Sequence, residues 1–320
     1  MIENIERKIL SGTLVAVFLY LSISIYSDLQ TLFVVFQNFN WSILPKIICL
    51  ILIGYFMRAY RWILYLQVLK IRIENKLSLL IFFSGLSMSI TPAKSGEILK
   101  SYLLKEINKT NMSSSAPIIF VERLTDMIGM LILALFGFLS FNYGDSGLLS
   151  AAIIIFLIFF ALYNKKTFHF LISLIDKIPI IGSRINFKEM YESSTRLLKP
   201  KLLFSAVFIS TISWFLECIC FYLILEGLGI DFSLIDATFI FAFSSIVGVL
   251  SMIPGGIGTT EGSILSLLIL SEISKSLAAA AVLIVRVCTL WFAVVIGLVS
   301  LKFFYRFILL ESNNSSISDV

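Results

Sequence analysis

The sequence predicts an all-α, polytopic membrane protein. Hydrophobic residues make up 58% of its 320 residues and charged residues 14%, and the mean hydropathy is +0.98. Soluble domains hold about 45–50% apolar and about 25% charged residues. Several apolar runs reach the roughly 20 residues that cross a bilayer, and no polar stretch is long enough for a water-soluble catalytic domain. We therefore expect a single integral membrane domain over residues 1–320.

The lysines and arginines orient the first predicted elements, because cytoplasmic loops are rich in these residues. A span over residues 9–27 leads outward to a loop without Lys or Arg, Asp28 to Trp41, and a span over 43–69 returns to the cytoplasm. Segments 77–91 and 95–107 are each too short to span and have basic residues on both flanks. They predict a re-entrant hairpin that enters from the cytoplasm and turns back.

The second half of the chain repeats this order of elements in the opposite orientation. A span over 116–142 closes the first half, which we take as an inverted repeat over residues 1–145, and the second repeat covers 146–310. The second repeat consists of two spans, a hairpin from the outside and a last span: 148–163, 202–225, 237–253 with 259–271, and 277–306. Hydropathy alone also allows residues 233–253 to be a full span. The predicted architecture is about six transmembrane helices plus two re-entrant helical hairpins.

Residues outside the spans set the predicted location. The loop 164–201 carries eight lysines and arginines, which marks it as cytoplasmic and attracts it to anionic headgroups. Both termini are then cytoplasmic, residues 311–320 form a disordered tail, and we expect a multi-pass protein of the plasma membrane. The four cysteines lie in apolar segments and the one histidine in a polar segment. We therefore expect no metal site, no disulfide and no cofactor.

Ten charged residues lie inside the predicted spans and hairpins, where each costs roughly 2.5–3.5 kcal/mol on insertion scales. Five are basic and five acidic: Arg58, Arg61, Lys94, Arg123 and Arg286 against Glu97, Glu122, Asp126, Glu217 and Glu261. This balance allows a closed salt-bridge network that holds helices together. The alternative is an anionic ligand, since arginine binds phosphate bidentately. The predicted topology places Glu217, Glu261 and Arg286 toward the outside and the others toward the cytoplasm, which predicts two polar vestibules.

Helical spacing and chain breaks favour the ligand interpretation. Arg58 and Arg61 share one helix face with Trp62, and two arginines on one face need an anion beside them. Two breaks rich in Pro and Gly interrupt the apolar segments, Pro92 to Glu97 and Pro254 to Glu261. Glycines next to a proline permit tight turns that leave backbone amides free for an anion. In the second break these residues are Pro254, Gly255, Gly256 and Gly258.

Taken together and in order, these motifs identify a family resemblance. They are Arg58-x-x-Arg61-Trp62, Pro92-x-Lys94-x-Gly96-Glu97, Glu122-Arg123-Leu124-x-Asp126, Pro254-Gly255-Gly256-x-Gly258-x-x-Glu261 and Arg286. The chain resembles, over nearly its whole length, the flippase-like transmembrane family that includes the membrane domain of lysylphosphatidylglycerol synthases, also called the multiple peptide resistance factor. Lys94 stands where that family commonly has arginine. The resemblance implies a stand-alone member without the aminoacyltransferase domain, which moves an amphipathic lipid between leaflets.

The sequence therefore predicts a lipid translocase without catalytic residues. We expect its substrate to be an anionic phospholipid or a polyprenyl-phosphate-linked lipid, which contacts the ten charged residues, Trp62 and the turn residues of the second break. Expected partners are membrane lipids and envelope-biosynthesis enzymes such as glycosyltransferases, with no nucleic acid. The alternatives are an intramembrane enzyme that uses a buried carboxylate as general acid or base, or an assembly subunit of a lipid-linked glycan or cell-envelope pathway.

Overall fold

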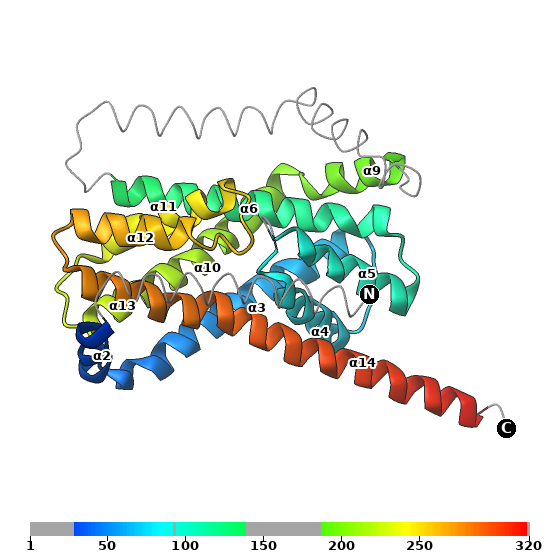
Figure 1. Ribbon diagram of the computed structural model, residues 1–320. Coiled ribbons are helices and arrows are strands. Elements are labelled where there is room, and N and C mark those ends of the chain that lie inside the picture. Colours follow the sequence, from blue (N-terminus) through cyan, green and yellow to red (C-terminus); the bar gives the residue numbers. More distant parts are fainter. Residues whose placement is uncertain (1–28, 92–93, 139–186, 319–320) are drawn as a thin grey trace.

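The computed structural model describes residues 29–91, 94–138 and 187–318, and these form helices joined by short connections (Figure 1). No β-strand occurs within these ranges, which agrees with the all-α prediction. The predicted spans over 9–27 and 148–163 lie outside the described residues, as does most of the predicted basic loop. The count of six spans therefore stays a prediction.

Three stretches of the described chain are long and apolar enough to cross a membrane. They are Trp41–Val68, Pro200–Gly227 and Lys275–Phe307, which correspond to the predicted spans 43–69, 202–225 and 277–306. The first contains α3 (Leu44–Val68) and the second is α10 (Pro200–Gly227). Both helices have a proline in their first turn. Backbone N–H groups at this position have no intrahelical acceptor, so the lack of an N–H in proline costs no helical hydrogen bond.

A further long helix, α6 (Met112–Phe138), carries charged residues in its middle. Its 27 residues extend about 40 Å at 1.5 Å per residue, more than the roughly 30 Å of hydrocarbon. Glu122, Arg123 and Asp126 lower its hydropathy, so composition alone does not select it as a span. The helix packs along α10 and, over its second half, along α11 (Leu234–Leu250). The charged residues therefore lie where neighbouring helices can supply partners.

One predicted loop is a helix. The segment Asp28 to Trp41 was expected to be an outer loop, but α2 (Leu29–Asn38) occupies most of it. The helix forms because its apolar residues find a packing surface: Leu32 is buried against Ala279 and Ala280. These alanines belong to α13, which is packed along α2.

Two more segments are helical where the sequence predicted none. α9 (Phe187–Leu197) lies at the end of the predicted basic loop and packs on α6. Leu197 is fully buried there, which explains why this part of the loop is ordered as a helix. α14 continues to Ser318, so the predicted disordered tail, residues 311–320, is helical over most of its length.

Both predicted breaks are present. The first follows α4 (Asn75–Gly85) and a short 3₁₀ turn, and the chain resumes at Ser95 in a second 3₁₀ turn and α5 (Leu99–Asn108). The second lies between α11 and α12 (Thr259–Leu270). In each case the two short helices pack against each other. Their orientation in a bilayer and the inverted repeat remain predictions.

The last predicted span is not one uniform helix. α13 (Lys275–Arg286) passes into a π-helical segment, Val287–Trp291, before α14 (Phe292–Ser318) begins. Short π-helical segments occur frequently at functional sites. Here the Tyr55 hydroxyl donates to the carbonyl of Thr289 at 3.1 Å, so this segment is bonded directly to α3.

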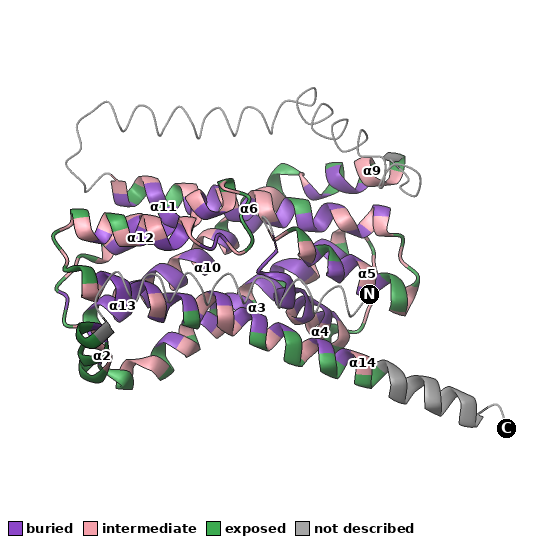
Figure 2. Ribbon diagram, in the orientation of Figure 1, coloured by how far each residue is buried: buried purple, intermediate pink, exposed green. Residues whose placement is uncertain are grey.

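Two apolar cores are separated by a polar layer. One core contains Tyr55 of α3, Met130 of α6 and much of α10, α11 and α13. The other contains Trp62 of α3, Val121 of α6, residues of α5, and Leu301 and Phe304 in the middle of α14. Figure 2 shows α13 largely buried, α10 partly buried and α2 largely exposed. Because the charged residues of α3 and α6 lie between the two cores, they lie near the middle of the bundle.

Gly297 allows α14 to pack closely on the 3₁₀ turn Leu86–Met88, which precedes the first break. A Cβ atom at Gly297 collides with backbone atoms of Leu86 and Ser87, whereas a Cβ at Gly262 of α12 meets nothing within 4 Å. We therefore expect Gly297→Ala to lower the free energy of unfolding by about 1–3 kcal/mol, the usual cost of overpacking. Gly262→Ala is the matched control, and it should raise stability slightly because alanine favours a helix. Reversible unfolding in mixed micelles measures both, and equal effects of the two substitutions contradict the packing argument.

Candidate functional site

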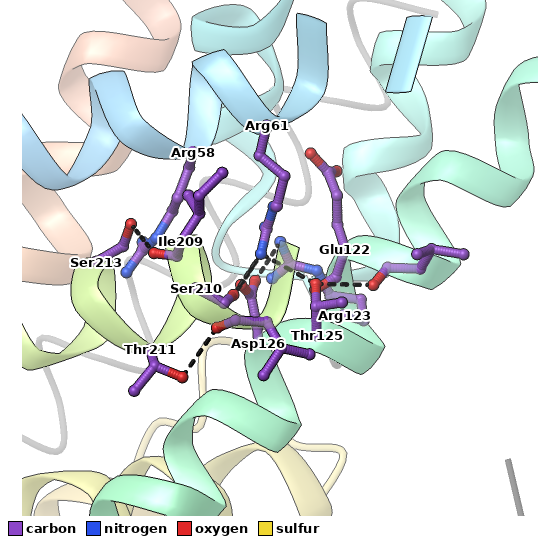
Figure 3. A network of polar contacts seen from close by, with 12 residues as sticks. Arg58, Arg61, Glu122, Arg123, Thr125, Asp126, Ile209, Ser210, Thr211 and Ser213 are labelled. Atoms are coloured by element: carbon purple, nitrogen blue, oxygen red, sulfur yellow. Dashed lines mark hydrogen bonds and ion pairs between the residues drawn. The ribbon is translucent and has the colours of Figure 1, made fainter. Parts of the chain in front are cut away.

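Six charged side chains form an alternating chain of ion pairs in the polar layer, and Figure 3 shows four of them, Arg61, Glu122, Arg123 and Asp126. It begins with Arg61 on Asp126 at 2.8 Å, and Asp126 also contacts Arg123 at 3.0 Å. Arg123 then contacts Glu97 at 3.3 Å. Lys100 contacts Glu97 at 3.0 Å and ends the chain on Glu122 at 2.5 Å. Three positive and three negative charges cancel, so we call this set the neutral network.

The neutral network joins four parts of the bundle. Arg61 comes from α3. Glu122, Arg123 and Asp126 come from α6, Glu97 comes from the first break, and Lys100 comes from α5. α10 is attached through Ser210, which donates to Asp126 at 2.5 Å and also contacts Arg61. Figure 3 shows Arg61 directed toward Asp126, Thr125 and Ser210. Because the charges satisfy each other, this network matches the predicted salt-bridge interpretation for its own members.

Lys100 is a member that the sequence analysis missed. We read it only as one of the basic residues that flank the first hairpin, but its side chain is 1% exposed and contacts two carboxylates. Its ammonium also lies 5.0 Å from the centre of the Trp62 ring, which is itself fully buried. One signal was available: Lys100 follows Glu97 by three residues, the spacing of facing side chains on a helix.

Two further ion pairs lie outside the neutral network. Arg58 contacts Glu217 of α10 at 2.5 Å, and Arg286 contacts Glu261 at 2.6 Å. The predicted division into a cytoplasmic and an outer vestibule is therefore wrong for Glu217, which was assigned to the outer group but pairs with a member of the cytoplasmic group. Helix packing brings these residues together although 159 positions separate them in the sequence.

The amides of the second break are largely used within the protein. Gly258 donates its N–H to Glu261 at 2.8 Å, and the N–H groups of Gly256 and Ile257 donate to Ile253 and Pro254. Glu261 thus caps its own helix and pairs with Arg286, whose second contact is the carbonyl of Gly255 at 2.6 Å. The expectation that the glycine amides of this break are free to bind an anion is therefore wrong for Gly256 and Gly258, because a carbonyl and the carboxylate of Glu261 accept their N–H groups.

A single pocket lies where the two breaks meet. Its lining includes Thr91 and Lys94 from the first break, Gly255 and Gly256 from the second, and residues of α3, α10, α11, α13, the π-helical segment and α14. The tight turn of the second break depends on glycine, since Gly256 has φ +63° and a Cβ there meets Thr260 at 2.6 Å. Residues predicted for two vestibules therefore line one pocket: Arg58, Lys94, Glu217 and Arg286.

Lys94 is the cation of this pocket without a carboxylate partner. None of the ion pairs among the described residues includes it. Its ammonium lies 5.4 Å from the centre of the Trp214 ring, and the guanidinium of Arg58 lies 4.7 Å from the same ring. Lys94 also has φ +56°, a left-handed conformation that costs a non-glycine residue about 1–2 kcal/mol. Strain of this kind concentrates at functional sites.

Trp214 is a second residue that the sequence analysis missed. It is 6% exposed and lines the pocket, and its indole nitrogen has no hydrogen-bond partner within the described residues. The Nε atom of Arg58 is likewise without a partner. The available signal was the spacing to Glu217, three residues later on α10, which places both side chains on one helix face.

The predicted site residues thus fall into three groups. The residues that line the pocket are Arg58, Lys94, Glu217, Gly255, Gly256 and Arg286. Those of the neutral network are Arg61, Glu97, Glu122, Arg123 and Asp126, with Trp62 beside it. Those of the turn in the second break are Pro254, Gly258 and Glu261. Pro254 is exposed and does not line the pocket. No cluster of three or more His, Cys, Asp or Glu able to hold a metal ion occurs in the part of the chain that the structure describes.

Sequence comparisons with known proteins cover most of this chain. A family model described as the lysylphosphatidylglycerol synthase TM region matches residues 9–297. A UPF0104 membrane protein from Methanocaldococcus jannaschii is 26% identical over 71% of this chain and 97% of its own length. Two UPF0104 membrane proteins from Methanothermobacter thermautotrophicus are 24% and 23% identical, over 75% and 76% of this chain and 77% and 80% of their own lengths. The matched residues include the pocket, both breaks and the neutral network.

Proposed function

The chain belongs to the family of the lysylphosphatidylglycerol synthase transmembrane region, and from this premise we propose that it is a flippase-like lipid translocase. It moves a lipid with an anionic headgroup, a phospholipid or a polyprenyl-phosphate-linked lipid, between the leaflets of the plasma membrane, with both termini in the cytoplasm. The observation that carries the proposal is Lys94, a cation that has no carboxylate partner among the described residues and lies in a pocket lined in part by both breaks.

The unpartnered groups around Lys94 support an anionic ligand. Among the buried side-chain atoms without a hydrogen-bond partner, those in residues that line the pocket are Arg58 Nε and Trp214 Nε1. Both atoms can only donate, and the Lys94 ammonium also has only donors. A ligand that satisfies them must supply acceptors, and phosphate oxygens are strong acceptors. The neutral network also has donors without a partner in the described residues, Arg61 Nε and Arg123 Nε, but its charges cancel. We therefore assign substrate binding to the pocket, where a positive charge is left over, and helix association to the network.

The position of the pocket supports translocation over simple binding. In many transporters the substrate site lies near the bilayer midplane at broken helices, and the two halves move around it to expose it to each side in turn. Here the pocket adjoins the polar layer between the two apolar cores and is lined by both breaks. The headgroup can pass through this polar region while its acyl chains remain in lipid.

Leaflet exchange in proteoliposomes tests the proposal. The vesicles contain a fluorescent anionic phospholipid or polyprenyl phosphate, and a membrane-impermeant quencher reports how much label reaches the outer leaflet. We expect the native chain to speed exchange and Lys94→Gln to slow it by tenfold or more, because a hydrogen bond to a charged group contributes about 1.5–3 kcal/mol.

Lys105→Gln is the matched control, since Lys105 is an exposed lysine on neighbouring α5. This variant should exchange lipid at the native rate. The proposal fails if the native chain moves none of the anionic lipids, or if Lys94→Gln exchanges lipid as fast as Lys105→Gln.

A further inference from the structure

We propose that the pocket selects a headgroup with a single negative charge, as a phosphodiester carries, over a phosphomonoester. This inference rests on the proposed function, because it takes the pocket as the place where the headgroup binds. A phosphodiester has one ionised oxygen, whereas a phosphomonoester carries about −1.5 to −2 at pH 7. The selection follows from the number of charges that the pocket leaves uncompensated.

The count is made from the ion pairs of the pocket. Arg58 is paired with Glu217 at 2.5 Å, and Arg286 is paired with Glu261 at 2.6 Å. Lys94 has neither carboxylate as an ion-pair partner. Three positive and two negative charges therefore leave one positive charge. The adjacent neutral network, with three charges of each sign, adds nothing to this sum.

Burial turns this count into selectivity. Arg58 is 6% exposed, Glu217 7%, Arg286 8% and Glu261 is fully buried. Lys94, which carries the uncompensated charge, is half-buried, so water compensates a net charge in the pocket only in part. Uncompensated charge at such a site costs several kcal/mol. A monoanion brings the sum to zero. A dianion leaves one negative charge, and its binding requires that an ion pair open or that another cation or a proton enter.

The donor geometry also suits a diester. Its two non-bridging oxygens share one charge and accept hydrogen bonds, while its two ester oxygens carry the rest of the lipid. The donors at hand are the Lys94 ammonium, Arg58 Nε and Trp214 Nε1, the last two without partners in the described residues. These donors can form hydrogen bonds with the non-bridging oxygens while Arg58 remains paired with Glu217 through another nitrogen, Nη2.

Competition binding to the purified full chain in lipid nanodiscs tests the selection. A fluorescent phosphatidylglycerol is displaced by three unlabelled lipids with identical acyl chains: phosphatidylglycerol, a phosphodiester; phosphatidic acid, a phosphomonoester; and phosphatidylcholine, a zwitterion. We expect phosphatidylglycerol to compete at least tenfold better than either of the others. Soluble glycerophosphoglycerol carries the same headgroup without chains, and we expect it to compete far more weakly, because the site serves lipids.

Three variants test whether the net charge of the pocket sets the preference. Lys94→Met leaves no net charge, and we expect it to lose the preference for phosphatidylglycerol over phosphatidylcholine. Glu217→Gln leaves two positive charges and should shift the preference toward phosphatidic acid. The double variant K94M/E217Q has one positive charge again, now on Arg58, and should regain the preference for phosphatidylglycerol. The double variant separates the charge count from any special role of the lysine.

The outcomes separate this inference from the proposed function. The inference is overturned if phosphatidic acid competes as well as phosphatidylglycerol in the native chain, or if glycerophosphoglycerol competes equally with the lipid. The ranking in the native chain decides this even if a variant fails to fold. If the ranking is as expected but no lipid exchanges between leaflets, the selection stands and the translocase proposal fails. If exchange depends on Lys94 but favours phosphomonoesters, the translocase stands and the selection fails.

Discussion

Replacing Lys100 by methionine is expected to destabilise the protein by about 3–5 kcal/mol, the usual cost of removing one partner from a buried ion pair. Lys100 is 1% exposed and bridges Glu97 and Glu122. Glu97 keeps Arg123 after the substitution, but Glu122 loses its ion-pair partner among the described residues while remaining fully buried. Methionine has a similar length, so the loss reports the charge and not a cavity.

The free energy of unfolding of purified protein in mixed micelles measures this loss, and Lys105→Met is the matched control. Lys105 lies on the same helix but is exposed, so its substitution should change stability by less than about 0.5 kcal/mol, as is usual for surface positions. The double variant K100M/E122Q removes both charges and should regain most of the loss. If Lys100→Met is no worse than Lys105→Met, the neutral network does not hold the bundle together.

The sequence predicted the elements of this bundle better than their contacts. Run length located α3, α10 and α13–α14, because each must bury or insert an apolar stretch of fixed length. Proline and glycine located both breaks, because these residues interrupt helices wherever they occur. These signals are local, and a local signal can be read along one chain. The resemblance to the family also rested on such local motifs, and the family match confirmed it.

Partner choice depends on packing between distant helices, and the sequence predicted it poorly. The spacing of Arg58 and Arg61 predicts that they share a helix face. It does not predict that Arg58 pairs with Glu217 and Arg61 with Asp126. Lys100 was read as a flanking charge because a lysine near a predicted membrane surface and a buried lysine look alike in sequence. Glu261 was expected to face a ligand, but its position three residues after Gly258 lets it cap its own helix.

The pair formed by Arg286 and Glu261 gives the second large expected effect. Arg286→Met should lower the free energy of unfolding by about 3–5 kcal/mol, because it leaves the fully buried Glu261 without its cation. It also removes the donor to the carbonyl of Gly255. Arg306→Met is the matched control, since Arg306 is exposed on α14. Unfolding in mixed micelles compares the two, and equal losses contradict a structural role for the pair.

The double variant E261Q/R286M separates the structural role of this pair from a role in binding. Glutamine can still accept the N–H of Gly258 and keep the cap, so most of the lost stability should return. The substitution removes one positive and one negative charge, which leaves the single charge of Lys94 in the pocket. We therefore expect E261Q/R286M to keep the preference for phosphatidylglycerol over phosphatidic acid. A stable double variant that loses this preference shows that Arg286 contacts the headgroup directly. Selectivity then depends on specific contacts and not on the net charge of the pocket.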